Sequence, residues 1–316
     1  RHRGSLMTPV QADSVTKRFG SFVAVEQADL RVEPGEVVAL LGANGAGKST
    51  TIRMLCGLLT PTGGSGSVAG FDIRTQSEEI KASIGYMSQK FSLYDDLTVE
   101  ENSNFYSGIY RIPREKKKER KEWVIEMAGL TQHRHSRTSI LSGGWKQRLA
   151  LASCIMHKPK LLLLDEPTAG VDPKARREFW DEIHDLTDNG LTVLVSTHYM
   201  DEAERCDKIC YLAYGKLLAR GTADEVIAAS NLQTWTVTGS SQKRILRLAR
   251  DLKDHNGVDI IAPFGNILHV SGTREDALEH AILPYRNDAD LTWKRDQPTL
   301  EDVFILMMKQ SQDNYQ

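Results

Sequence analysis

The chain of 316 residues is 40% hydrophobic and 26% charged, a balance that favours a packed core over disorder. Its formal net charge of -2 argues against nucleic acid as a partner, because nucleic-acid binders usually carry a basic surface. The four scattered cysteines fit a reducing compartment rather than a disulfide scaffold, and no apolar run is long enough to cross a bilayer.

The N-terminal part of the chain is predicted to be rich in strands. Residues 1–7 lack the apolar stretch of a signal peptide and are interpreted as a cloning scar or a disordered segment. From about residue 10 to residue 68, strands predominate and one helix interrupts them. The run Glu36–Leu41 is apolar and β-branched and leads into glycine-rich sequence, which is typical of a buried strand that feeds a loop. A helix follows at Ser49–Leu59, and a stretch rich in proline and glycine ends it.

The middle of the chain combines a helical block with two further buried strands. Residues 97–156 carry apolar residues at helical spacing. The runs Leu161–Leu164 and Leu191–Val195 are predicted strands, with a helix at Ala175–Thr187 between them. Strands that alternate with helices indicate a parallel sheet covered on both faces, and the helical block is then an insertion into this α/β core.

The pattern changes after about Gly221. Four short strands and two helices follow in the order βαββαβ, which suggests a small ferredoxin-like α+β domain. The strands are expected at 232–238, 258–262, 267–271 and 290–293, the two helices at 242–254 and 273–283, and a last helix at 299–309.

A phosphate-binding motif follows the first predicted parallel strand. The residues from Gly42 to Ser49 match the pattern G-x-x-x-x-G-K-S/T, with a strand before it and a helix after it. Glycines allow successive N–H groups to point at one phosphate, and the helix start adds its positive end. Lys48 would bind the β- and γ-phosphates, and the Ser49 hydroxyl would ligate Mg²⁺.

Two acids, Asp165 and Glu166, follow the second parallel strand at the sheet edge where α/β proteins bind ligands. Such a pair alone is more often a helix cap or a turn, but together with the phosphate loop it indicates catalysis. Asp165 would then orient the Mg²⁺ shell, and Glu166 would polarise the attacking water. The later acids Asp201, Glu202 and Glu204 open a helix, where the helix dipole stabilises them, and no catalytic role is assigned to them.

Leu141-Ser142-Gly143-Gly144 resembles the signature motif of ATP-binding cassette (ABC) proteins, and it lies between the phosphate loop and the acidic strand as in that family. The family's other motifs follow in the expected order, and the resemblance covers about residues 10 to 221. In these motifs, Phe19 corresponds to the aromatic residue that stacks on adenine, and Gln89 corresponds to the Q-loop glutamine. Asp172 corresponds to the D-loop aspartate, and His198 corresponds to the switch histidine.

The resemblance implies the fold and the site. The fold would be a P-loop NTPase cassette at 8–222, made of a RecA-like parallel sheet core, an antiparallel β subdomain and an inserted helical subdomain at about 93–157, followed by an accessory domain at 228–316. ATP and Mg²⁺ would be its ligands. Glu166, His198 and Gln89 would be catalytic, and Ser49, Gln89 and Asp165 would hold the metal. The nucleotide contacts would come from Phe19, Val25, Gly42, Asn44, Gly45, Ala46, Gly47, Lys48, Ser49, Thr50, Ser142, Gly143, Gly144 and Asp172.

In the family, the signature element of one cassette meets the γ-phosphate held by a second, so a homodimer that closes on two ATP molecules is implied. The N–H groups at the start of the helix after Ser142 favour such anion binding. One position departs from the family pattern, because Trp145 stands where glutamine is usual. An indole can donate one hydrogen bond or stack, whereas glutamine can also accept. The phosphate contacts need only Ser142 and the backbone, so function is expected to survive this departure, and its effect on the hydrolysis rate and the finer geometry remains open.

The C-terminal sequence Gln297–Phe304 and the stretch Lys90–Asn102 resemble ATPases of ABC-2 type exporters. The resemblance implies a cytoplasmic subunit held on the inner face of the cell membrane by permease partners. The tail has the alternative interpretation of an amphipathic helix that caps a small domain. A soluble ATPase acting on ribosomes, a regulatory cassette without turnover and one half of a tandem protein also remain open.

Overall fold

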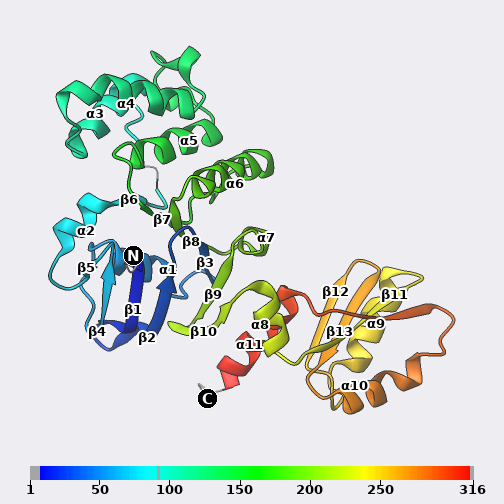
Figure 1. Cartoon of the computed structure of the whole chain (residues 1–316). Helices are drawn as coiled ribbons and strands as arrows, with labels where there is room; N and C mark the ends of the chain where they lie inside the picture. Colours follow the sequence, from blue (N-terminus) through cyan, green and yellow to red (C-terminus); the bar gives the residue numbers. More distant parts are fainter. Residues whose placement is uncertain (1–7, 91–92, 314–316) are drawn as a thin grey trace, which may run out of the picture. The chain divides into compact units, whose positions relative to one another are not determined.

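The computed structural model describes residues 8–90 and 93–313, so the segment interpreted as a cloning scar, residues 1–7, lies outside the described residues. Two compact units divide the chain, one ending at Ala219 and the other beginning at Arg220. Each unit has its own β-sheet structure and its own buried core (Figure 1).

A six-stranded sheet forms the centre of the first unit, with the strand order β10-β9-β3-β8-β7-β6. Strands β6, β7, β8, β3 and β9 pair in parallel. All residues of β3, β7 and β8 are buried, which explains why apolar residues predominate in their sequences. The bounds are β3 Val37–Leu41, β6 Ile84–Met87, β7 Leu161–Asp165, β8 Thr192–Thr197, β9 Lys208–Ala213 and β10 Lys216–Gly221. The predicted parallel sheet is therefore confirmed.

A smaller antiparallel sheet in the first unit has the order β2-β1-β4-β5. Its strands are β1 Val10–Phe19, β2 Phe22–Val32, β4 Gly63–Val68 and β5 Phe71–Asp72. Their inward side chains share one hydrophobic core with α1 (Lys48–Leu55) and the central sheet, and Leu30, Val38 and Ile52 are among its members. The helix α1 ends at Leu55, four residues before the predicted end, because Gly57 adopts a left-handed conformation with φ 70°.

The helical block forms between β6 and β7, as predicted. It contains α3 (Val99–Ile109), α4 (Arg114–Met127) and α5 (Gly143–Cys154), which share a core of their own. Apolar residues of α5 and of the segment just beyond it are buried in this core: Leu149, Ala152 and Met156 are all 0% exposed. A shorter helix, α2 (Ser77–Ser83), precedes β6.

Two helices follow β7 and β8, the strands that lead to the two acids and to the histidine. The helix α6 (Pro173–Asp188) connects β7 to β8 and buries Phe179, Trp180 and Ile183 in the core beneath these strands. Pro173 occupies its first turn, where a missing N–H has no cost. The short helix α7 (Met200–Ala203) follows β8 and carries Glu202.

The second unit contains α8 (Ala223–Ala229) and an antiparallel sheet of order β12-β13-β11-β14. The strands are β11 Gln233–Gly239, β12 Ile260–Phe264, β13 Ile267–Gly272 and β14 Leu291–Asp296, and the helices are α9 Gln242–Leu252 and α10 Glu275–Ile282. Apolar residues of α9 and α10 pack on one sheet face, among them Ile245, Leu248 and Leu278. The element order βαββαβ agrees with the prediction.

The last helix, α11 (Leu300–Asp313), begins one residue after Thr299. The Thr299 hydroxyl and N–H both donate to Oδ2 of Asp302, at 2.8 and 2.9 Å, and the Asp302 N–H donates back to the hydroxyl. Val303 and Phe304 are buried. The tail sequence thus encodes a helix start with an apolar face.

Candidate active site

The loop from Gly42 to Gly47 connects β3 to α1 and is shaped by glycine. A Cβ on Gly42 would lie 2.2 Å from the carbonyl oxygen of Leu212, so no larger residue fits. Gly47 has φ 105° and forms the N-cap of α1, a conformation that other residues rarely adopt. Asn44 and Gly45 are exposed at the loop, whereas Ala46 is buried. The loop therefore presents its backbone and the helix N-terminus at one place, as an anion site requires.

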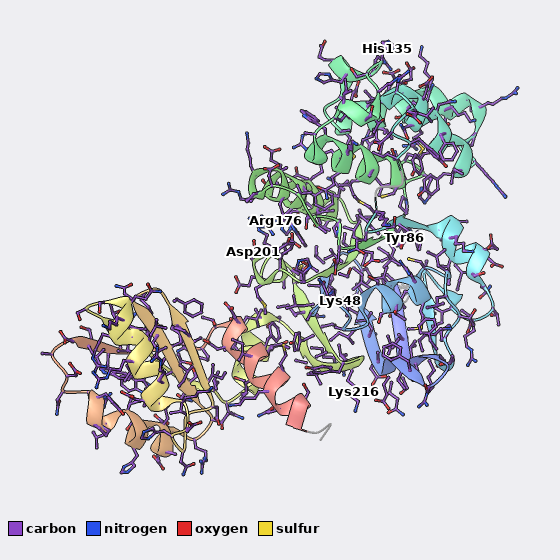
Figure 2. The ribbon with its side chains drawn as sticks, turned by 180° about the vertical axis from the view of Figure 1, so that it is seen from behind. Lys48, Tyr86, His135, Arg176, Asp201 and Lys216 are labelled. Atoms are coloured by element: carbon purple, nitrogen blue, oxygen red, sulfur yellow. The ribbon has the colours of Figure 1, made fainter. Side chains whose placement is uncertain are left out.

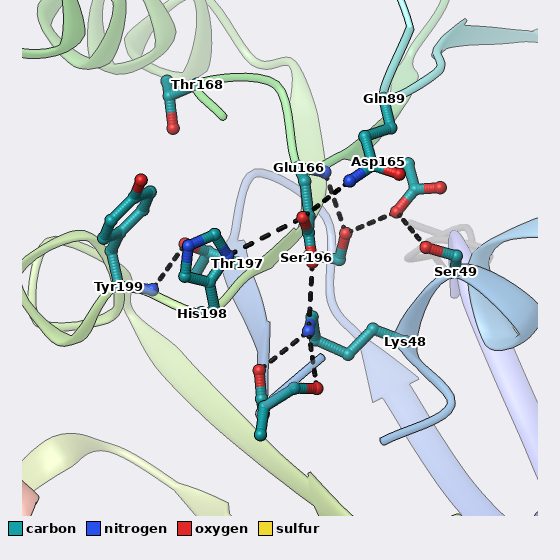
Figure 3. A network of polar contacts seen from close by, with 12 residues as sticks. Lys48, Ser49, Gln89, Asp165, Glu166, Thr168, Ser196, Thr197, His198 and Tyr199 are labelled. Atoms are coloured by element: carbon teal, nitrogen blue, oxygen red, sulfur yellow. Dashed lines mark hydrogen bonds and ion pairs between the residues drawn. The ribbon is translucent and has the colours of Figure 1, made fainter. Parts of the chain in front are cut away.

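Lys48 is held at the centre of the site. Its side chain is only 3% exposed, and its Nζ donates to the carbonyl oxygens of Gly42 at 2.7 Å and Ala43 at 3.0 Å (Figure 3). The same Nζ lies 3.1 Å from Oε1 of Glu166. The phosphate loop and the carboxyl end of β7 thus meet at one buried ammonium group.

Asp165 joins three elements at the end of β7. Its Oδ1 accepts hydrogen bonds from the hydroxyls of Ser49 at 2.9 Å and Ser196 at 2.8 Å. Its Oδ2 is buried and has no hydrogen-bond partner among the described residues. A buried carboxylate oxygen without a partner, beside the Ser49 hydroxyl, fits a hard cation with oxygen ligands.

Glu166 has an unusual backbone and converging partners. Its φ of 47° is in the left-handed region, and its N–H donates to Oγ of Ser196 at 2.9 Å. Gln89 Nε2 donates to its Oε2 at 3.0 Å, and His198 Nδ1 lies 3.6 Å from the same oxygen, too far for a hydrogen bond. Strain of this kind is frequent at functional sites. Gln89, His198 and Lys48 thus surround one carboxylate.

Ser196 is a site residue that the sequence analysis did not assign. Its hydroxyl contacts both acids, donating to Asp165 and accepting from the Glu166 N–H. The available signal was a hydroxyl residue near the end of a buried strand, where an apolar side chain would be usual.

Three other predicted nucleotide contacts, Phe19, Val25 and Thr50, lie in elements around the phosphate loop. Phe19, at the end of β1, is 49% exposed, and Lys17 Nζ lies 5.2 Å above its ring. Val25 is fully buried, and a Cβ on Gly47 would meet its Cγ2 at 3.2 Å, so Val25 supports the loop from within the core. Thr50 is half-buried in the first turn of α1.

The signature residues belong to the helical block. Ser142 is exposed and caps α5, accepting from the Trp145 N–H at 3.5 Å, and Gly143 begins the helix. A Cβ on Gly144 would lie 2.7 Å from Cβ of Ala175, so this glycine lets α5 approach the first turn of α6. Asp172, one residue before α6, accepts from the N–H groups of Lys174 and Ala175.

Trp145 packs within its own unit. Its ring packs against Gly129, so closely that a Cβ added to this glycine would lie 2.9 Å from Cζ3 of the indole. The Arg148 guanidinium lies 5.6 Å from the centre of the ring. The stacking that the sequence suggested for the indole is therefore with the helical block.

Two groups beneath the site have raised pKa values. Burial, with a contribution from the Asp165 carboxylate, raises the pKa of the Cys56 thiol well above its ordinary value. Burial, with the neighbouring Cys56 and Asp165, raises the pKa of Tyr86 to about 12. Both groups therefore stay neutral near pH 7. The four cysteines, all within the described ranges, form no disulfide.

The glycine loop, the buried lysine and the two acids at the ends of parallel strands define a P-loop nucleotide-binding protein. Comparison with known proteins specifies the family further. The family model described as "ABC transporter" matches residues 25–169. A model for an AAA domain described as a putative AbiEii toxin matches residues 141–200.

Several curated proteins are similar to this chain. The linearmycin resistance ATP-binding protein LnrL of Bacillus subtilis is 34% identical over 94% of this chain and 97% of its own length. The Nod factor export ATP-binding protein I of Rhizobium etli is 33% identical over 95% of this chain and 93% of its own length. The probable multidrug ABC transporter ATP-binding protein YbhF of Escherichia coli is 48% identical over 71% of this chain, but this match spans only 39% of YbhF.

Solved structures give the same result. The ATP-binding subunit of an ABC transporter superposes with a TM-score of 0.63 at 29% identity, covering 70% of this chain and 93% of that one. A dimeric post-hydrolysis ATP-binding cassette, MJ0796 with ADP and Pi, superposes with a TM-score of 0.61 at 28% identity, covering 67% of this chain and 98% of that one. The chain belongs to the ATP-binding proteins of ABC transporters. No helix among residues 8–90 and 93–313 has the length and apolar character needed to span a membrane.

Proposed function

We propose that this protein hydrolyses ATP as the nucleotide-binding subunit of a membrane exporter. The observation that carries the proposal is the convergence of Lys48, Gln89 and His198 on the Glu166 carboxylate, beside the phosphate loop. In this arrangement, Lys48 and the loop N–H groups bind the β- and γ-phosphates. Phe19 offers an exposed ring on which adenine can stack.

Hydrolysis follows from the position of Glu166. The Glu166 carboxylate accepts a proton from a water molecule whose oxygen attacks the γ-phosphorus, and the bond from that phosphorus to the bridging oxygen breaks to leave ADP and phosphate. A general base contributes roughly 10²–10⁴-fold to such a rate. Gln89 and His198, both beside the carboxylate, would orient it and the attacking water.

Asp165 and Ser49 would hold Mg²⁺, with the Gln89 side-chain oxygen as a further candidate ligand. The orphaned Oδ2 of Asp165 and the adjacent Ser49 hydroxyl are the observations that support this role. When bound, Mg²⁺ neutralises charge on the phosphate oxygens.

The active form would be a homodimer that closes on two ATP molecules. Ser142 lies exposed at the N-terminus of α5, where free N–H groups favour a phosphate. Across the dimer, Ser142, Gly143, Gly144 and Asp172 would approach the nucleotide held by the partner cassette. The dimeric cassette structure at 28% identity supports this arrangement. ATP then favours the closed dimer only while its γ-phosphate is present.

Export is supported by the relatives whose names describe Nod factor export and linearmycin resistance, because these matches extend over both units of the chain. The partners would be ABC-2 type permease subunits, which hold the protein on the inner face of the cell membrane. The first unit would be the nucleotide-binding domain. In the second, the strand order β12-β13-β11-β14 supports a ferredoxin-like accessory domain.

The decisive experiment measures phosphate release and dimerisation for the wild type and Glu166→Gln. We expect the variant to lose hydrolysis and to accumulate as an ATP-bound dimer. Equal phosphate release by both proteins would contradict the role of Glu166. Purification from gently solubilised membranes would test the export role, where a stoichiometric polytopic partner supports it and ribosomal proteins contradict it.

A further inference from the structure

Glu202 is a buried acid that the proposed chemistry does not use. It lies on α7 and is 1% exposed, whereas its neighbours Asp201 and Glu204 are exposed. The dipole of α7 stabilises acids at the start of the helix, but it gives no reason for Glu202 to turn inward. A buried carboxylate requires hydrogen-bond donors or cations.

The two carboxylate oxygens of Glu202 accept short hydrogen bonds from two different segments, the loop after β7 and the end of β8. The Thr168 hydroxyl donates to Oε1 at 2.5 Å, and the Thr197 hydroxyl donates to Oε2 at 2.6 Å. Thr168 and Thr197 are themselves 2% and 1% exposed. The Thr197 hydroxyl also accepts from the N–H of Tyr199 at 3.0 Å, which fixes the direction of its own proton toward Glu202.

The two threonines belong to the two segments that carry the proposed catalytic groups. Thr168 lies two residues after Glu166, and Thr197 immediately precedes His198 (Figure 3). One carboxylate therefore connects the backbone that positions the general base to the backbone that positions the histidine.

Arg176 brings a third segment to the same group. It lies in the first turn of α6, which begins directly after Asp172. Its Nε is 3.9 Å from Glu202 Oε1, and its guanidinium lies 4.3 Å from the ring centre of Tyr199. Figure 2 shows Arg176 beside Asp201, where the ion-pair distance is 3.9 Å.

We propose that Glu202 is a positioning residue for ATP hydrolysis, which couples the loop after Glu166, the switch-histidine loop and the start of α6. The inference rests on the proposed function. A carboxylate suits this role because it only accepts, so both threonine hydroxyls must donate to it in one geometry. Charge-assisted hydrogen bonds of this kind are shorter and stronger than neutral ones.

The test compares Glu202→Gln with Glu204→Gln in the full-length protein. The control makes the same chemical change on an exposed acid two residues away. An amide presents one accepting atom in place of two, so the threonines can no longer both donate, and the charge that faces Arg176 is lost. The measurements are kcat and KM for ATP, thermal unfolding, and hydrogen exchange of peptides covering 166–172 and 196–202.

We expect Glu202→Gln to lower kcat by roughly 10- to 100-fold, because small displacements of reacting groups can cost about 10²-fold. KM should change by less than about threefold, since the phosphate loop is unaltered. Exchange should rise in both peptides and not in the loop from Gly42 to Gly47. The control should behave like the wild type.

A kcat for Glu202→Gln within twofold of the control would overturn the inference, and so would hydrogen exchange that rises in only one of the two peptides. A rise of hydrogen exchange throughout the first unit, together with a lower unfolding temperature, would also overturn it, because the variant would then be generally destabilised. A wild type without hydrolysis would refute the proposed function and the catalytic part of this inference. The exchange measurement would then still decide whether Glu202 couples the two loops. A double-mutant cycle between Thr168→Val and Thr197→Val adds a check. If the changes in activation free energy, calculated from kcat, are additive in the double variant, the two threonines are not coupled.

Discussion

The Lys48 ammonium nitrogen lies 3.1 Å from Oε1 of Glu166, and both side chains are buried. Each charge satisfies the other, as buried ionic groups require. In the proposed function, Lys48 binds phosphate and Glu166 accepts a proton from water. The ammonium thus has two anionic partners, the carboxylate and the nucleotide, that compete for it.

This competition predicts that Glu166→Gln binds ATP more tightly as well as failing to hydrolyse it. Removing the carboxylate charge weakens its hold on Lys48, and a gain of about 3- to 10-fold in affinity is expected, equivalent to about 0.7–1.4 kcal/mol. Calorimetry with a non-hydrolysable ATP analogue, at concentrations where the protein is monomeric, would measure it. Unchanged or weaker binding would show that Glu166 does not compete, and Glu204→Gln serves as the control.

A second prediction concerns Lys48→Ala, which removes the cation from both partners. ATP affinity should fall by at least about tenfold, because a charged contact to phosphate is lost. The free energy of unfolding should also fall, by about 3 kcal/mol, because Glu166 is left as a buried charge without its cation.

The double variant Lys48→Ala/Glu166→Gln separates these two effects. It should recover stability, since no buried carboxylate remains at position 166, but it should not recover ATP affinity. Urea denaturation and calorimetry measure the two quantities. Recovery of both together would mean that Lys48 acts on nucleotide binding only through the fold.

The sequence predicted the local structure of the phosphate loop. Strand β3, the glycine loop and the start of α1 at Lys48 follow one another along the chain, so hydrophobic pattern and glycine spacing were sufficient. The inward turn of Glu202 and the contact of Ser196 with both acids were not predicted, because they depend on which strands lie side by side. The signature and D-loop residues were named from the resemblance, and their approach to a nucleotide across a dimer remains a prediction.

The packing of Trp145 against Gly129 is another contact that the sequence did not predict, and it gives a third prediction. Because the indole fills space beside Gly129 in the helical block, Trp145→Gln should lower the free energy of unfolding by about 1–3 kcal/mol. The kcat for ATP should change by less than about threefold, since Ser142 and the backbone at the start of α5 are retained. Trp145→Phe is the control that keeps an aromatic ring. A large fall in kcat with unchanged stability would instead place the indole in the nucleotide site.

The last prediction concerns pH and His157, between α5 and β7. Its Nε2 lies 3.1 Å from the carbonyl oxygen of Ile84, so this nitrogen carries the proton, and its ring stacks on Tyr110 at 4.0 Å. Its Nδ1 is buried and has no partner among the described residues. Burial therefore lowers the pKa of His157 below its ordinary value of 6.5.

Below pH 6.5 the unfolded chain binds a proton at this position that the folded chain does not, so stability falls as the pH drops from 6.5 toward the lower folded pKa. Above pH 6.5 both states are neutral and the effect vanishes. His157→Gln can keep the hydrogen bond to Ile84 without titrating. Urea denaturation at about pH 7.5 and 5.5 should therefore show a smaller loss of stability for the variant than for the wild type. Equal losses would mean that His157 accepts its proton in the folded protein as readily as in the unfolded chain.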